Sequence, residues 1–274
     1  MTEKITTPVI IILAIILTGT SVYSSRLLGK VKNIEISKSD EDLGITPLPF
    51  EANDPASEKD ISKTVNIALF GIDKRSPSDI GRSDSIMIAS LDTQHKKIKL
   101  TSIMRDTYVN IREFASVDFE GLEFIIDALG GVEITLKENE VSYVPGSSPG
   151  TQILNGEQAL AYSRIRKIGN GDFERTERQR IILEYVINQG LSAGISQYPK
   201  LLSAILPYVD TILSQAEILR LGGTIFSTGI KDIEQFRIPV DGYARDSIMD
   251  GVYYLVPDTL EDNVGALHEF IYER

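Results

Sequence analysis

Three arginines lie within six positions of an otherwise acidic chain. They are Arg175, Arg178 and Arg180, in the stretch NGDFERTERQR at 170–180. The 274 residues include 28 basic and 39 acidic side chains, for a net charge of −11, so a generally basic surface is not expected. These arginines therefore need a local reason.

The stretch that carries them has the periodicity of a helix. The sequence from Glu174 to about Asn188 predicts an amphipathic helix, with Asp172 or Thr176 near its start and Gly190 as its stop. Successive side chains on such a helix are turned by about 100°, so the spacing assigns each arginine to a side.

Arg175, Arg178 and Gln179 fall on the apolar side of this helix, and we expect them to point inward. The apolar stripe on that side consists of Ile182, Tyr185 and Val186. Arg180 falls on the opposite side, which predicts an ordinary solvated position. Its neighbours there, at i−3 and i+4, are Glu177 and Glu184.

An inward-facing guanidinium must find an anion. It keeps its charge, because its pKa is above about 12, and burying that charge without a partner costs several kcal/mol. The anion can be a buried carboxylate of the protein or a bound ligand. Two arginines and a glutamine on one turn leave both alternatives open.

Acidic residues elsewhere predict a site for a hard cation. Asp73 ends the strand-like run VNIALFGID, and Asp84 lies in GRSDS, where the next such run begins. Ligands tend to bind at strand ends in α/β sheets, so these two carboxylates could share one cation. The alternative is that each aspartate only caps a turn.

Further arginines are predicted to reach the same edge of the sheet. Arg105, in SIMRD, ends the third strand-like run, and Arg164 and Arg166 share one side if that segment is extended. Arginine forks pair bidentately with phosphate oxygens, and a metal ion bridges such oxygens. The combined set of acids, arginines and Gln179 therefore matches a polyphosphate better than a sugar or a peptide.

The order of the predicted elements indicates a mixed α/β fold, in which helices flank a central, mainly antiparallel or mixed sheet. Strands are predicted at 65–73, 85–92, 97–104, 132–136 and 234–240, with a hairpin turn at 92–97. Helices are predicted at 119–129, at 156–163 after a start signal at Asn155 and Gln158, and at 198–206, 215–226 and 257–272.

The N-terminal residues predict a membrane anchor. The run from Ile5 to Ser25 is almost uncharged and close to the ~20 residues that cross a bilayer. We expect residues 1–25 to form a short cytoplasmic tail and an uncleaved transmembrane helix, because no convincing signal-peptide cleavage site follows. Residues 26–62, rich in acidic clusters and prolines, predict a linker, and 63–274 predict one domain.

The composition limits the metals and partners. The chain has no cysteine and two histidines, His95 and His268, which we expect at the surface. A metal ion would therefore use oxygen ligands, which favours magnesium, manganese or calcium over zinc. An acidic chain without a DNA-binding motif also lacks the electrostatic basis for binding nucleic acid.

Several blocks of the sequence resemble, in order, the extracytoplasmic domain of LytR-CpsA-Psr proteins. The blocks are GIDKR, GRSDSIM, SIMRDTYV, VDFEGLEFIIDALGGVEI, LNGEQALAYSRIRK and GDFERTERQR, and they cover residues 64 to 190 approximately. An N-terminal anchor followed by a linker is also typical of that family.

The resemblance implies an enzyme that moves a phosphoglycan from a polyprenyl-diphosphate carrier to a hydroxyl group of peptidoglycan. Teichoic acid or capsule would thereby become attached to the cell wall. Asp73 and Asp84 would hold Mg²⁺, with Mn²⁺ as an alternative, and Arg105 and Asp172 would join them in catalysis. The diphosphate would be bound by Arg75, Arg82, Arg105, Arg164, Arg166, Arg175 and Gln179.

The same resemblance implies a single-pass protein of the cell membrane whose main domain lies outside the cytoplasm and works on membrane lipid. The positive-inside rule alone favours the opposite orientation, because Arg26, Lys30 and Lys32 follow the apolar run.

The chain departs from the family pattern between 110 and 117. Only NIREFAS connects the RDTYV and VDFEG blocks, where family members carry a further helix and strand that help to form a lipid-binding pocket. The alternative to an active transferase is therefore a non-catalytic homologue that binds cell-wall polymer or partner proteins.

Overall fold

The computed structural model describes Arg26 and residues 28–34, 63–74, 79, 81–104, 113–193, 197–249 and 252–273. The predicted transmembrane run from Ile5 to Ser25 lies outside these residues and stays a prediction. Within the described ranges, no helix combines the length and apolar character that crossing a bilayer requires.

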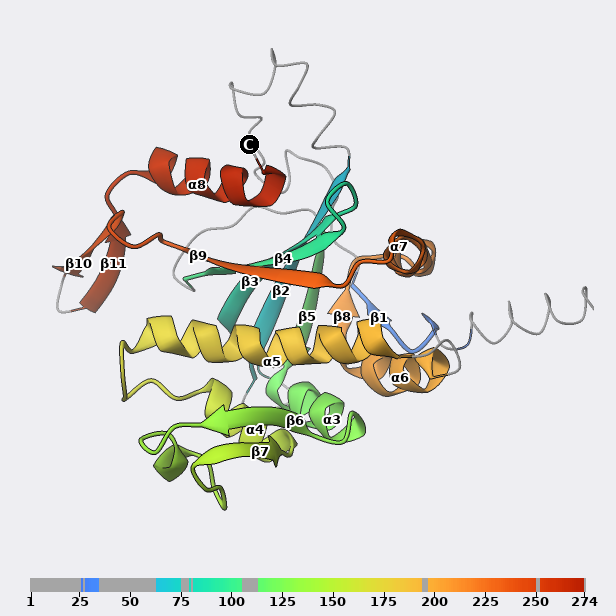
Figure 1. The fold of residues 1–274 in the computed structure, drawn as a ribbon, viewed down its shortest axis with the longest axis horizontal. Helices are drawn as coiled ribbons and strands as arrows, with labels where there is room; N and C mark the ends of the chain where they lie inside the picture. The colour runs from blue at the N-terminus through green and yellow to red at the C-terminus, as the bar shows by residue number, and fades with distance from the viewer. Residues whose placement is uncertain are drawn as a thin grey trace, which may run out of the picture.

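A seven-stranded mixed sheet forms the centre of the molecule, in the order β1-β8-β5-β2-β3-β4-β9 (Figure 1). Antiparallel pairs join β2 to β3, β3 to β4 and β5 to β8, whereas β2–β5, β4–β9 and β1–β8 are parallel. The strands are β1 (Lys32–Asn33), β2 (Thr64–Asp73), β3 (Arg82–Asp92), β4 (Lys97–Ile103), β5 (Phe114–Asp118), β8 (Asp210–Thr211) and β9 (Asp232–Ile238).

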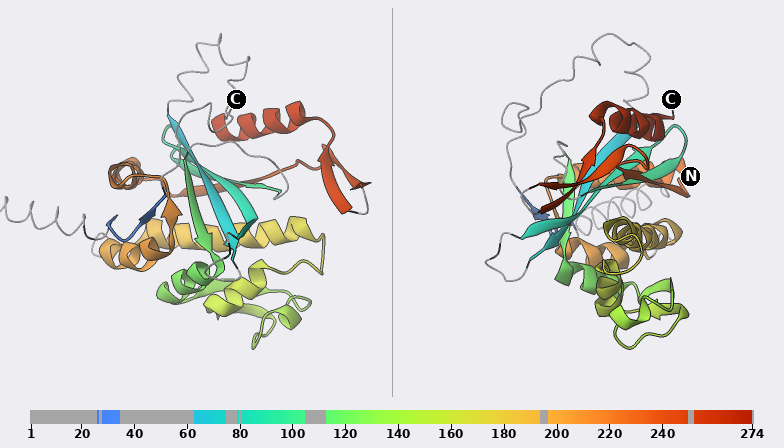
Figure 2. Two further views of the ribbon diagram at one scale, coloured as in Figure 1. Left: turned by 180° about the vertical axis from the view of Figure 1, so that it is seen from behind. Right: turned by 90° about the vertical axis from the view of Figure 1, so that its left-hand side faces the viewer.

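Helices cover both faces of this sheet, as Figures 1 and 2 show. The helices are α3 (Phe119–Ala128), α4 (Gly156–Ser163), α5 (Asp172–Ser192), α6 (Tyr198–Ile205), α7 (Gln215–Thr228) and α8 (Leu260–Tyr272). The described residues also form the 3-10 turns η2 (Val141–Tyr143) and η3 (Leu206–Tyr208).

The two faces follow from the alternation of side chains along each strand. On β3, Leu91 points to the face where α5 and α7 pack, whereas Ile86 and Ile88 pack with Leu267 of α8 on the other face. On β4, Leu100 belongs to the first face and Ile103 to the second. The predicted α-β-α arrangement with a mixed central sheet is confirmed.

A smaller layer packs against the far side of α5. It consists of α3, α4 and the antiparallel pair β6 (Val132–Leu136) and β7 (Gly150–Leu154). Its core includes the fully buried Ile126, Val132 and Leu154, and Ile182 of α5 joins them. Helix α5 is therefore covered on two sides, by the sheet and by this layer.

Local signals in the sequence mark several boundaries correctly. Asn155 and Gln158 form the predicted start of α4 as a reciprocal capping box, in which each side chain accepts a hydrogen bond from the other residue's backbone N–H. The predicted hairpin turn joins β3 to β4. Helix α5 instead runs through Gly190, where we predicted its stop, and ends at Ser192.

A second antiparallel pair, β10 (Ala244–Met249) and β11 (Val252–Pro257), precedes α8 and was not predicted. Because β11 takes up residues 252–257, α8 begins at Leu260 rather than at the predicted position 257.

Residues 28–34, in the segment predicted as a linker, contact the domain. Leu28 is buried, and Lys32 and Asn33 form β1, which pairs in parallel with Asp210 and Thr211 of β8. The Asn33 side-chain amide also donates to the carbonyl of Leu213, 3.0 Å away. A strand pairing between residues this far apart in sequence leaves no local signal in composition, so the linker prediction did not include it.

Candidate active site

A bulge in the central sheet presents Asp84. Gly71 of β2 lies opposite Ser85 of β3, but the next residue, Ile72, lies opposite Ser83, so Asp84 has no cross-strand position in this pair. The Ser83 hydroxyl donates to the carbonyl of Ser85 across the bulge (3.1 Å). Bulges bend a strand and re-aim a side chain, and they are frequent beside active sites.

Two guanidinium groups meet at Asp84. Arg166 Nη2 donates to Asp84 Oδ1 at 2.7 Å, and Arg175 Nη1 donates to the same oxygen at 3.0 Å. The Arg175 side chain is only 1% exposed, whereas those of Asp84 and Arg166 are 14% and 37% exposed. The inward orientation predicted for Arg175 is therefore confirmed.

Asp172 holds the same two arginines from the other side. Arg175 Nη2 donates to Asp172 Oδ2 at 2.9 Å, and Arg166 Nε lies 3.4 Å from Asp172 Oδ1. Two carboxylates and two guanidiniums thus alternate in one closed cluster, which we call the Asp84 cluster. The positions of both arginines are fixed by opposing acids, as anion-binding groups need to be.

Gln179 lies one helical turn after Arg175 on α5. Its side-chain oxygen Oε1 is buried and has no hydrogen-bond partner among the described residues, and the same is true of Arg175 Nε. A buried polar atom without a partner costs about 1–3 kcal/mol, so such atoms call for an explanation. A bound ligand that contacts these atoms would supply one.

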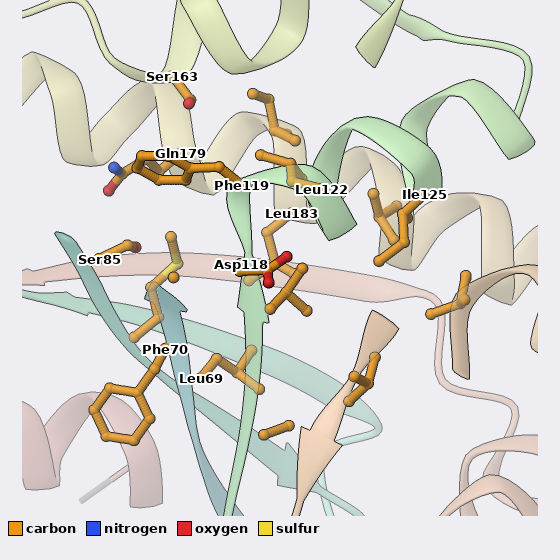
Figure 3. A pocket seen from close by; sticks show the side chains of 18 residues that line it. Leu69, Phe70, Ser85, Asp118, Phe119, Leu122, Ile125, Ser163, Gln179 and Leu183 are labelled. Carbon is orange, nitrogen blue, oxygen red and sulfur yellow. The ribbon is translucent and has the colours of Figure 1, made fainter. Parts of the chain in front are cut away.

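An apolar cavity of about 280 Å³ lies beside the cluster, between the sheet and helices α3, α5 and α6. Most of its lining is apolar, and Figure 3 shows Ser85, Ser163 and Gln179 on one side of it and Ile125 on the other. Ser85 and Gln179 place that polar side next to the Asp84 cluster. Apolar cavities with a few converging polar groups are typical of ligand sites.

The remaining predicted residues lie around this site or outside the described residues. Asp73 ends β2, opposite Arg82, which is exposed at the start of β3. Arg164 is exposed at the end of α4, and its guanidinium carbon lies 4.6 Å from the ring centre of Phe119, a residue of the cavity wall. Arg75 and Arg105 fall outside the described residues.

Arg178 points inward as predicted, but its anions are carboxylates of the protein. Its Nε donates to Glu140 Oε1 (2.8 Å) and its Nη2 to Glu174 Oε2 (2.7 Å), while Nη1 donates to the carbonyl of Ile165 (3.1 Å). The side chains of Arg178 and Glu140 are 3% and 2% exposed. Arg178 is therefore a structural residue, and Arg175 belongs to the site.

Glu174 also holds the loop before α5. The backbone N–H of Asn170 donates to it and lowers its pKa, and Arg178 adds to this effect against a smaller opposing effect of burial. The loop that leads from Arg166 to Asp172 is thereby attached to the helix that carries Arg175.

Arg180 is not on a solvated face, so that prediction is wrong. Its side chain is buried, and its Nε donates to Gln235 Oε1 of β9 at 2.9 Å. Burial lowers its pKa. Two-sided coverage of α5 explains the error, because the helix buries more than the single stripe that periodicity alone predicts.

A second acidic group lies far from this site in the fold, at the hairpin between β3 and β4. Asp92, His95 and Glu273 approach closely enough to hold a metal ion. The buried ammonium group of Lys99 already lies 3.2 Å from Asp92 and 3.1 Å from Glu273, so a cation of the protein fills that role. The His95 side chain is 33% exposed, and its Nδ1 lies 2.7 Å from Asp92 Oδ2, so His95 belongs to the same ion-pair group.

Comparison with known proteins identifies the family. The model of the LytR_cpsA_psr family matches residues 38–115 and 109–266, which together are most of the chain. The chain belongs to the LytR-CpsA-Psr family. The two matched segments of this family model overlap at 109–115.

Individual relatives within the LytR-CpsA-Psr family agree with this assignment. The chain is 30% identical over 307 aligned residues to the polyisoprenyl-teichoic acid--peptidoglycan teichoic acid transferase TagU of Bacillus cereus, with 96% of both chains covered. The crystal structure of Bacillus subtilis TagV is 25% identical, with a TM-score of 0.57 over 76% of this chain and 97% of TagV.

The fold extends to more distant structures. Protein gbs0355 of Streptococcus agalactiae matches with a TM-score of 0.65 at 23% identity, over 81% of this chain and 91% of gbs0355. This likeness concerns the arrangement of the sheet and its helices.

Three features of the site were not predicted from the sequence. The bulge at Asp84 depends on the pairing of β2 with β3, and the cavity is assembled from three strands and four helices that are separate in sequence. The position of Arg164 over Phe119 depends on how α4 packs beside α3. GRSDS offered one indirect signal for the bulge, since small polar residues interrupt a strand that is otherwise apolar.

Proposed function

We propose that this protein is a phosphotransferase that attaches a polyprenyl-diphosphate-linked glycopolymer, of the teichoic acid or capsule type, to peptidoglycan. One observation carries the proposal: the guanidiniums of Arg166 and Arg175 meet at Asp84, and the next residue, Ser85, lines an apolar cavity together with Gln179 of α5. A lipid diphosphate is the kind of substrate that needs both features together. The activity in the name of TagU agrees with this substrate class.

Each part of the substrate has a matching region of the site. The diphosphate would lie against the forked donors of Arg166 and Arg175 and against Gln179, whose side-chain amide N–H groups can donate to phosphate oxygens. The isoprenoid chain next to the diphosphate would occupy the cavity, whose wall includes Ala115 and Val117 of β5. Arg164 and Arg82, both exposed, would contact the outer phosphate and the first sugars.

The reaction is a phosphoryl transfer. A hydroxyl oxygen of peptidoglycan attacks the phosphorus that carries the glycan, and a new P–O bond forms while the bond to the bridging diphosphate oxygen breaks. Polyprenyl monophosphate leaves, the hydroxyl proton is lost to solvent or a carboxylate, and the product is a phosphodiester. Such transfers need mainly positioning and neutralisation of negative charge.

Asp172 is committed to positioning in this scheme. Its two oxygens each lie against an arginine, Arg175 at 2.9 Å and Arg166 at 3.4 Å, so it orients both donors toward the phosphates. A role in proton transfer would require one of these contacts to open when the substrate binds.

The donor set suits a magnesium ion, with manganese as an alternative. Mg²⁺ is typically bound by one or two carboxylates together with substrate phosphates, and Asp73 and Asp84 lie at the neighbouring ends of β2 and β3. Arg166 and Arg175 both donate to the same carboxylate oxygen of Asp84, Oδ1. When bound, the ion would neutralise phosphate charge and favour the leaving group.

We further propose that residues 5–25 anchor the protein in the cell membrane, with the N-terminus in the cytoplasm and the main domain outside it. The substrate is carried on a membrane lipid and the acceptor is peptidoglycan, so an anchored extracytoplasmic domain is in reach of both. The location of the substrate and the acceptor therefore decides the orientation, although the charges of Arg26, Lys30 and Lys32 favour the opposite one.

The second candidate is a homologue that binds cell-wall polymer or partner proteins without transferring the polymer, and the shortened segment between 110 and 117 favours it. The deciding experiment incubates the full chain in proteoliposomes with lipid-linked glycan, peptidoglycan and Mg²⁺, and measures glycan bound covalently to peptidoglycan. Asp84→Ala is expected to abolish attachment, whereas the exposed Arg245→Ala on β10 keeps it. Binding of the lipid-linked glycan without any attachment would favour the second candidate.

A further inference from the structure

One end of the molecule carries an exposed apolar helix face. On α7, Leu219 and Phe226 are 54% and 62% exposed, and they lie seven residues apart, on one side of the helix. Leu221 and Ile225, on the other side of the helix, pack on α5 and the sheet. The outer face is therefore not needed for the core of the domain.

This face also lacks acidic side chains in a strongly acidic protein. The exposed residues of α7 are Gln215, Ala216, Leu219, Arg220, Gly222, Gly223, Phe226 and Ser227. The helix has one acid, Glu217, and its carboxylate accepts hydrogen bonds from the backbone and hydroxyl of Ser214 at the helix start. Apolar and basic residues together are typical of a helix that lies in a bilayer interface.

The chain enters the domain next to α7. Asn33 of β1 donates to the carbonyl of Leu213, and Ile34 N–H donates to Thr211, two and four residues before α7 begins at Gln215. Figures 1 and 2 show β1, β8, α6 and α7 together at one end of the molecule, opposite β10 and β11.

The length of chain between the predicted membrane span and this attachment is short. The apolar run ends at Ser25, and Leu28 is already buried in the domain. Three residues reach at most about 11 Å, at up to 3.6 Å each. If residues 5–25 span the bilayer, the end of the domain that holds β1 cannot move away from the bilayer surface.

From these observations we infer that the outer face of α7 lies in the bilayer interface, with Leu219 and Phe226 inserted among the lipids. The exposed Arg26 and Lys30 in the segment before β1 would contact anionic headgroups. The inference rests on the proposed anchoring. A domain held in this way has a defined orientation at the membrane, which the linker predicted at 26–62 alone would not give it.

This orientation has a consequence for the substrate. The lining of the apolar cavity includes Ile205 at the end of α6 and Val209 directly before β8, both in the part of the fold that holds β1, as well as Gln179 beside the Asp84 cluster. A lipid carrier could therefore reach the cavity from the bilayer without leaving it completely.

Fluorescence quenching by lipids tests the inference, and the absence of cysteine from the chain makes each label unique. The full chain carrying Phe226→Cys is labelled with an environment-sensitive fluorophore and reconstituted into vesicles that contain lipids with nitroxide groups on their acyl chains. Ile248→Cys on β10 is the matched control, because Ile248 is an apolar residue that is 76% exposed at the other end of the molecule. Leu219→Cys is a second test position on the same face.

The label at 226 is expected to lose most of its fluorescence to nitroxide lipids, and the label at 248 none beyond the background of free collisions. Equal quenching at both positions would overturn the inference, and so would failure of the chain to enter vesicles. Shielding of 226 that depends on protein concentration instead of lipid would indicate a second copy and also overturn it. Loss of transfer activity with quenching intact would refute the proposed function alone.

Discussion

The different roles of Arg178, in the buried ion pair with Glu140, and of Arg175, in the Asp84 cluster, predict different losses of stability when each is replaced. Arg178→Met removes three hydrogen bonds and leaves Glu140, 2% exposed, without its charged partner. Removing one member of a buried ion pair typically costs 3–5 kcal/mol, and we expect a loss of about that size in the free energy of unfolding.

Arg175→Met should cost less. Asp84 and Asp172, the two carboxylates that it contacts, are 14% and 27% exposed, and both keep a contact with Arg166. The loss of charged hydrogen bonds that remain partly solvated predicts about 1–3 kcal/mol.

Urea unfolding of the full chain in detergent micelles, followed by circular dichroism, measures both values if the dependence on urea is unchanged between variants. The double variant Arg178→Met with Glu140→Leu should recover part of the loss, because removing both partners of a buried pair is often neutral. A cost below about 1 kcal/mol for Arg178→Met, the range of surface pairs, would refute the structural role of Arg178. So would strict additivity in the double variant.

Three further predictions concern the site and the ion-pair group at the hairpin. Arg175→Ala should weaken binding of a short polyprenyl diphosphate by about 1.5–3 kcal/mol in titration calorimetry. Arg245 is exposed on β10, so Arg245→Ala is the control and should leave binding unchanged. Arg180 cannot serve as the control because it is buried. Gln179→Leu removes a buried oxygen that has no hydrogen-bond partner among the described residues. Thermal stability should therefore be kept or raised, while transfer activity falls. A clear loss of thermal stability would show that the oxygen has a hydrogen-bond partner in the free protein. Burial alone would raise the pKa of Asp92, but hydrogen bonds from His95 and Lys99 outweigh it and lower that pKa below its ordinary 3.8. Asp92 therefore stabilises the fold above about pH 4 and loses this effect as the pH falls, so Asp92→Asn should be less stable at pH 7 and show a flatter loss in acid unfolding curves; an unchanged slope would contradict this.

How far the sequence predicts this protein depends on how local each feature is. The capping box of Asn155 and Gln158 and the hairpin after Asp92 are made by residues close in sequence, and both were predicted. The inward position of Arg175 follows from helical spacing, which is also local. These signals suffice for the order of elements and the mixed α/β class.

Features made by distant segments were not predicted. The burial of Arg180 depends on Gln235 in β9, 55 residues away, and the pairing of β1 with β8 joins residues about 180 positions apart. The orientation of Asp84 depends on a register shift between β2 and β3. The periodicity of either strand alone does not predict this shift. Periodicity placed both Arg175 and Arg178 inward, but only the positions of Glu140 and Asp84 distinguish a structural arginine from one in the site.

The central claim is that the Asp84 cluster and the neighbouring cavity carry out a metal-assisted transfer from a lipid diphosphate. The most direct measurement is the release of polyprenyl monophosphate from a polyprenyl-diphosphate glycan by the full chain, as Mg²⁺ is titrated, beside Asp84→Asn. We expect release that rises with Mg²⁺ and is lost in the variant, while circular dichroism shows that the variant is folded. Release that is independent of Mg²⁺, or equal in Asp84→Asn, would contradict it.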